Sequence, residues 1–260
     1  MRKFASAAAV SFMIGIVNSL SGLPAAAQDL TTDWTGTYAG GHVGWISGSA
    51  GLDTTLSDAL DAGVTSSATA FHMSDLVGGV HAGYNIVQNG PYVFGIEGDF
   101  DWTRTREGTA STFTLIDVFD GGTDTFTSLD SFIARLDWLS SFRARAGVAD
   151  NNLMLYLTGG IAFANANLTT TNGASDVLCS PACVTTAGSF TRSDSKTLVG
   201  YVIGSGAEMK FTDNISGRVE YLYYNFGSNT FTLSDGEENV SQKLDIHENV
   251  VRVGLSYYFK

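Results

Sequence analysis

Apolar and polar residues alternate with a period of two along most of the chain beyond residue 35, which is the pattern of β-strands whose successive side chains point to opposite faces. The pattern is clearest at the C-terminal end, in the apolar row Val251, Val253, Leu255, Tyr257 and Phe259. Together with this last segment, seven others predict eight strands: they lie near residues 36–48, 74–87, 92–103, 131–149, 153–165, 196–211 and 218–224.

The connections between these segments alternate between short and long. The short ones contain the Asn, Asp and Gly residues that close hairpins. Outer-membrane barrels have short periplasmic turns and long extracellular loops, and an even number of strands returns both chain ends to one side. The short connections are residues 88–91, 150–152 and 212–214, and the long polar ones are residues 49–72, 104–130, 166–195 and 229–243.

Three all-β architectures fit this order: an outer-membrane barrel, a soluble ligand-holding barrel and a β-sandwich. Alternation alone does not tell the inner face from the outer one. A soluble barrel places its apolar row inside, whereas in lipid the apolar row faces outward and the charges line the interior. Aromatic residues at the strand ends favour the membrane: Trp45, Tyr92, Trp102, Trp138, Phe211 and Phe259.

The N-terminus has the features of a secretory signal peptide. Arg2 and Lys3 precede an apolar stretch, and small residues end it at Ala27. We therefore expect residues 1–27 to be a cleaved signal peptide and residues 28–260 to form the barrel domain. Export, the ordered connection lengths and the aromatic strand ends together predict the bacterial outer membrane.

Composition excludes several other classes of protein. Charged residues make up 15% of the chain and hydrophobic residues 44%, so the chain has enough apolar residues to avoid disorder. The formal net charge of −12 argues against nucleic-acid binding, which requires a basic surface. Beyond the N-terminus there is no run of ~20 apolar residues, the length that a membrane-spanning helix needs.

The two cysteines, Cys179 and Cys183, are four positions apart in a segment that contains Pro181. In an oxidising compartment this spacing favours a small disulfide loop, and two free thiols are the alternative. Without further cysteines or paired histidines the pair does not predict a zinc site.

Four segments resemble the small outer-membrane barrel proteins of alphaproteobacteria, known as porin-family or outer-membrane immunogenic proteins and related to opacity-type proteins. The resemblance implies an eight-stranded barrel among outer-membrane lipid and lipopolysaccharide, with the last strand read by the barrel assembly machinery as an assembly signal. Lys260 departs from the family, in which the terminal residue is commonly aromatic. Some members of the family bind haemin at the surface. The segments are WTGTYAGGHVGW at 34–45, GIEGDFDW at 95–102, RARAG at 143–147 and EYLYYNFG at 220–227.

The interior of an eight-stranded barrel is just wide enough for side chains. On the expected inner face we find six acidic and six basic residues, and two interpretations stay open: a polar pore lining, or a plug of ion pairs, which the small lumen favours. These residues are Glu97, Asp99, Asp101, Asp137, Glu208 and Glu220, with Arg135, Arg143, Arg145, Lys210, Arg218 and Arg252.

No catalytic, cofactor or metal centre is expected. His247 and Ser256 lie nine residues apart on one strand, a separation of ~30 Å, and the other histidines lack metal-motif spacing. The sequence thus predicts a non-enzymatic surface protein that supports the envelope and displays loops to the environment or to a host. Alternatives are a small passive pore, or a haemin-binding protein that uses His72 or His247 at the outer rim.

Overall fold

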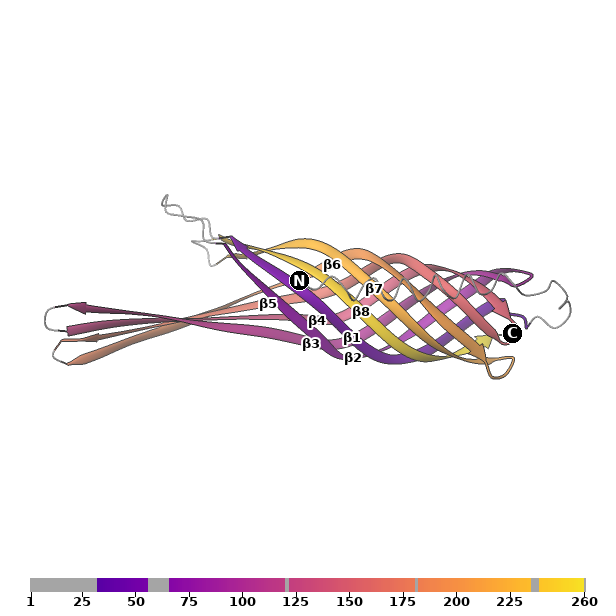
Figure 1. Cartoon of the computed structure of the whole chain (residues 1–260), viewed down its shortest axis with the longest axis horizontal. Coiled ribbons are helices and arrows are strands. Elements are labelled where there is room, and N and C mark those ends of the chain that lie inside the picture. The colour runs from indigo at the N-terminus through magenta and orange to yellow at the C-terminus, as the bar shows by residue number, and fades with distance from the viewer. Residues whose placement is uncertain (1–31, 56–65, 120–121, 181, 235–238, 260) are drawn as a thin grey trace, which may run out of the picture. The chain divides into compact units, whose positions relative to one another are not determined.

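The computed structural model describes residues 32–55, 66–119, 122–180, 182–234 and 239–259, so the expected signal peptide lies outside the described residues. Eight antiparallel strands close into a barrel in which β8 pairs with β1 (Figure 1), which confirms the predicted fold class. Among the described residues no helix is long and apolar enough to span a membrane. The strands are β1 (Gly36–Thr55), β2 (Ser66–Asn89), β3 (Tyr92–Phe119), β4 (Gly122–Asp150), β5 (Leu153–Cys179), β6 (Cys183–Lys210), β7 (Ile215–Ser234) and β8 (Asn239–Phe259).

Short turns close three hairpins at one end of the barrel, where the sequence predicts them. Gly90 and Asn151 have positive φ angles of 59° and 51°. This left-handed conformation is the one that Gly and Asn adopt most readily in tight turns. In an outer-membrane barrel this is the periplasmic end.

The long connections at the other end differ from the prediction. Instead of irregular loops, most of their described residues continue the strands, so that β3 reaches Phe119 and β4 begins at Gly122. These segments are rich in Thr and Ser, and cross-strand hydroxyl pairs form between Thr114 and Thr127 and between Thr171 and Thr191. Because Thr and Ser lie on both faces of these extensions, the sequence lacks the contrast between faces that reveals a strand.

Four of the extensions continue the barrel sheet as a four-stranded projection beyond the barrel. The β2–β3 ladder ends at the pair Val77 and Thr103, and the β6–β7 ladder ends at Tyr201 and Asn225. Further out, β3, β4, β5 and β6 remain paired in that order, and Figure 1 shows them as a long twisted projection. We call this projection the blade: residues 104–119, 122–137, 165–179 and 183–200.

A lipid-facing band surrounds the barrel. The apolar row of β8 points outward, with side chains 49% to 61% exposed, and it covers nine residues, within the ~9–11 that a tilted spanning strand needs. Outward aromatic residues mark its limits, including Trp45, Trp102 and Phe211. Toward the blade, every strand changes from apolar to polar on its outward face at a similar level: Ser47, Ser74, Arg104, Asp137, Asn165, Thr197, Asn225 and Asn249.

The barrel interior is filled in three layers. Trp34, Tyr38 and Tyr258 pack with other apolar side chains at the periplasmic end. Charged side chains fill the middle. An apolar layer closes the end next to the blade, and its buried members include Ile46, Val77, Leu136, Leu139, Leu198, Leu222 and Val250.

Candidate functional site: the ion-paired lumen

The charged layer arises from strand alternation, because residues that flank lipid-facing positions point into the barrel. Glu97 of β3 lies opposite Arg143 of β4, so the register brings opposite charges together. Five acidic and five basic residues of the predicted set are buried, each at most 6% exposed. They are Glu97, Asp99, Asp101, Glu208 and Glu220, with Arg143, Arg145, Lys210, Arg218 and Arg252.

Two arginines hold the centre of this layer. Arg143 contacts Glu97 at 2.5 Å, Asp99 at 2.7 Å and Glu220 at 3.1 Å. Arg252 contacts Glu220 at 2.7 Å, Asp99 at 2.8 Å and Asp101 at 3.1 Å. Both guanidinium groups are therefore shared among carboxylates from β3 and β7, which ties distant strands across the lumen.

Further bonds extend the network toward the periplasmic end. Arg145 donates to Glu208 at 2.7 Å and to the Tyr38 hydroxyl at 2.8 Å. Lys210 donates to the backbone carbonyl of Asp33 at 2.6 Å, which fastens the segment before β1 to the bottom of the barrel. Since unpaired buried charge costs several kcal/mol, this pairing is a condition for the charged layer to exist.

A chain of hydrogen bonds that the sequence did not reveal joins four strands in the same layer. The Nδ1 atoms of His42 and His81 lie 3.1 Å apart, His42 also contacts Asp101, and His81 Nε2 lies 2.9 Å from the Ser256 hydroxyl. Both histidines occupy inward positions, a signal present in the alternation. Their meeting, however, depends on the β1–β2 register, which the long connection conceals.

Two residues of the predicted set lie elsewhere. Arg135 and Asp137 are exposed on the outward face of β4. The cause is a β-bulge between Leu136 and Trp138, where Asp137 is an extra residue opposite β5. A bulge shifts the alternation by one position, so the prediction that these two side chains point inward was wrong.

The polar network ends below the apolar layer. Glu248 is fully buried, and neither of its carboxylate oxygens has a hydrogen-bond partner in the described structure. Its carboxylate lies against Gly48, where any Cβ would collide with it. The buried hydroxyl of Tyr224, directly opposite Glu248 on β7, is likewise without a partner among the described residues. Buried polar groups of this kind destabilise a fold.

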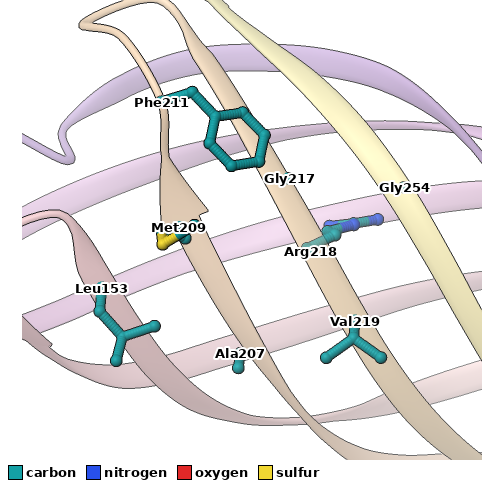
Figure 2. A pocket seen from close by; sticks show the side chains of 8 residues that line it. All are labelled: Leu153, Ala207, Met209, Phe211, Gly217, Arg218, Val219 and Gly254. Atoms are coloured by element: carbon teal, nitrogen blue, oxygen red, sulfur yellow. The ribbon is translucent and has the colours of Figure 1, made fainter.

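The barrel also has a shallow outer groove of about 360 Å³ near its periplasmic end. Figure 2 shows Leu153, Met209, Phe211 and Val219 around it, and all four side chains belong to the lipid-facing band. Apart from Arg218, whose side chain is buried in the lumen, the residues that line the groove are apolar or glycine, and the groove lies on the lipid-facing side of the barrel. No group of three or more His, Cys, Asp or Glu residues in the described part of the chain is arranged to hold a metal.

The remaining candidate residues lie toward the blade. Cys179 and Cys183 form a disulfide at the end of the β5–β6 hairpin. His247 stacks on Tyr223 with ring centroids 6.2 Å apart, and the two side chains are 3.2 Å apart at their polar atoms. The side chain of His72 lies outside the described part.

Comparison with known proteins agrees with this architecture. Residues 16–259 match the family model described as the outer membrane protein beta-barrel domain. The 25 kDa outer-membrane immunogenic protein of Brucella abortus is 30% identical over 87% of this chain and 79% of its own length. The 31 kDa outer-membrane immunogenic protein of Brucella melitensis is 30% identical over 94% of this chain and 91% of its own.

Among solved structures, OprG of Pseudomonas aeruginosa aligns over 88% of this chain and 99% of that chain, with a TM-score of 0.48 and 8% identity. The family match covers nearly all of the chain. A membrane barrel needs an outward apolar band flanked by aromatic residues, and the lipid-facing band has both features. The chain belongs to the outer membrane β-barrel family of the outer-membrane immunogenic proteins.

Proposed function

We propose that this outer-membrane protein is a non-conducting structural barrel whose main role is to hold the blade outside the membrane. One observation carries the proposal: Arg143 and Arg252 are each bonded to three carboxylates in the middle of the lumen. An ion passing through would have to displace these bonds. Apolar layers lie on both sides of them.

Planar-bilayer recording of the refolded protein tests this proposal. We expect no steady channels, because the interior of an eight-stranded barrel is filled by its own side chains. A wide porin recorded in the same bilayers serves as the positive control. Steady single-channel steps from the purified protein would contradict the plug and support the alternative, a small passive pore.

The proposal includes the absence of enzymatic activity. Ser256 and His81 lie within hydrogen-bond distance, which is the contact that a nucleophile and its base require. Both are only 3% exposed and belong to the packed charged layer, so a substrate has no access to them. Incubation with ester, peptide and phospholipid substrates tests this point, and turnover lost in Ser256→Ala would contradict it.

Outer-membrane lipid and lipopolysaccharide form the surroundings of the barrel. We further propose that the barrel assembly machinery reads the outward row Val251, Val253, Leu255, Tyr257 and Phe259 as the assembly signal. All five side chains are accessible on one face of β8. Phe259→Ala should therefore lower the folded fraction in the outer membrane. An unchanged heat-modifiable band would count against this signal.

Haemin binding at the surface is the second candidate. It is favoured by His247, a rim histidine whose side chain is 35% exposed and stacked on Tyr223. Titration with haemin should shift the Soret band in the native protein and not in His247→Ala. Equal spectra for the two proteins would reject His247 as a haem ligand.

A further inference from the structure

The blade has two outer edges that bear no neighbouring strand in the described structure. On one side the ladder between β2 and β3 stops at Thr103, and on the other the ladder between β6 and β7 stops at Tyr201. Residues 104–119 of β3 and 183–195 of β6 therefore have no hydrogen-bonded strand on their outer side in the described structure, whereas from Lys196, which donates to the Thr230 carbonyl, the β6 segment again lies beside β7. Such an edge is a template for pairing with another strand.

Each edge contains a stretch without the charges and prolines that protect natural edges from pairing, although both edges carry charged residues outside that stretch. Charged residues, proline and bulges normally perform that task, yet residues 183–191 and 108–116 contain no charge and no proline. On the β6 edge, Val184 and Phe190 are 64% and 52% exposed, and on the β3 edge Ile116 is 66% exposed. A Cβ added at Gly188 would meet nothing within 4 Å, so the face of the sheet is open at this position and accepts a side chain.

The directions of the edges select the partner. β3 runs away from the periplasmic turns and β6 runs back toward them. Because the membrane fixes every copy in one orientation, the β3 edge of one copy and the β6 edge of its neighbour are antiparallel without any rearrangement. Two β6 edges would be parallel, which pairs less favourably. Confinement to one membrane also raises the effective concentration of the second copy.

The two uncharged stretches also match in length, at nine residues each. With residues 108–116 laid antiparallel to residues 183–191, Ile116 falls opposite Cys183. This register leaves the charged residues of both edges outside the paired stretches.

We propose that the blades of two copies of this chain in the same membrane associate edge to edge, with residues 108–116 of one copy pairing with residues 183–191 of the other. This inference goes beyond display of the blade: the blade becomes the contact through which barrels assemble. It is independent of conduction, so a bilayer recording leaves it unaffected.

Site-specific cross-linking tests the pairing in whole cells. Thr112→Cys and Ala187→Cys occupy facing positions in the expected register, and both are exposed. Cells that express both variants should form a cross-linked dimer under mild oxidation, while the Cys179–Cys183 bond stays closed. Leu129→Cys is the matched control, because Leu129 lies beside Thr112 on the interior strand β4.

Two results would overturn the proposal. The first is a dimer yield from Thr112→Cys with Ala187→Cys that is no higher than the yield from Leu129→Cys with Ala187→Cys. The second is a stronger cross-link between two copies of Ala187→Cys. A charge on the edge gives a second test. Gly188→Lys should lower the dimer yield about tenfold, the loss that ~1.4 kcal/mol produces. Ala174→Lys, at the facing position on the interior strand β5, should leave it unchanged. Equal yields from these two folded variants would also contradict edge pairing.

Discussion

Strands β3 to β6 pass through two environments, and the comparison between their lower and upper halves explains how the molecule divides its tasks. In the barrel each strand has one face in lipid and one in a packed interior, so every position has a defined contact. In the blade, beyond the buried apolar layer that includes Leu136, Leu168 and Leu198, most of the described side chains of the same strands are half-buried or exposed, and Thr pairs replace the buried ion pairs. The lower halves therefore supply stability, and the upper halves supply accessible surface.

The largest expected effect comes from breaking the centre of the lower region. Arg143→Met keeps the length and bulk of the side chain but leaves Glu97, Asp99 and Glu220 without one of their cations. Removing one partner of a buried ion pair costs ~3–5 kcal/mol. We expect a clear fall in the urea midpoint of the protein in detergent micelles, measured by the mobility of unheated samples on gels.

Arg104→Met is the matched control for this experiment. Arg104 lies on the outward face of β3, where the lipid-facing band gives way to the blade, and its side chain is exposed. Surface charges contribute ~0–1 kcal/mol, so its midpoint should barely move. If both variants lose the same stability, the charged layer does not have the structural role argued for it.

Two tyrosines allow hydrogen-bonded and unpartnered hydroxyl groups of the described residues to be compared within the lumen. The Tyr38 hydroxyl donates to Glu97 at 2.8 Å and accepts from Arg145 at 2.8 Å. Tyr38→Phe should therefore destabilise the barrel by ~1–3 kcal/mol. Tyr224→Phe removes a buried hydroxyl that has no partner among the described residues, so the same urea titration should show equal or higher stability. Similar losses in the two variants would show that the network does not end below the apolar layer.

Removal of the disulfide tests the same division by perturbing the blade and not the barrel. The bond between Cys179 and Cys183 closes the end of the blade far from the lumen. A loop of this size contributes ~2 kcal/mol by chain entropy, and that contribution is local. Cys179→Ser with Cys183→Ser should speed proteolysis at the end of the blade and leave the urea midpoint of the barrel unchanged. A lower barrel midpoint would mean that the two regions unfold together.

Sequence patterning predicted the lower region well because lipid enforces a strict alternation there. The outward row from Val251 to Phe259 and the inward positions of Glu97 and Arg143 follow from the period-two alternation alone, once the lipid-facing side is known. Arg135 and Asp137 escaped the prediction because a bulge depends on the partner strand, which a single sequence does not show. The meeting of His42 with His81 depends on register in the same way.

The blade was harder to predict for a different reason. Its strands carry Thr and Ser on both faces, so the period-two contrast disappears and the segments resemble loops. Thr nevertheless favours strands because its branched Cβ fits a pleated surface. In residues 108–116, the Thr-rich composition together with the absence of proline is the signal that could have indicated a strand.

The smallest expected effect concerns acidic residues of the blade. Asp124 lies opposite Asp117, and a hydrogen bond with Asp176, then desolvation, then the negative charges of Asp176 and Asp117 raise the pKa of the Asp124 carboxyl above its ordinary value. A carboxyl with a raised pKa binds its proton more tightly in the folded blade than in the unfolded chain. The blade should therefore lose some stability as the pH rises from the unfolded pKa of ~3.9 through the folded one.

Asp124→Asn removes this titration, so protection of the blade against an acid-active protease should depend less on pH in the variant than in the native protein. The urea midpoint of the barrel should remain the same in both, because the ion pairs of the lumen lie outside the reach of a screened surface charge. If the barrel midpoint instead followed the protonation of Asp124, the two halves of these strands would be one cooperative unit. The division between a stabilising barrel and a solvent-exposed blade would then fail.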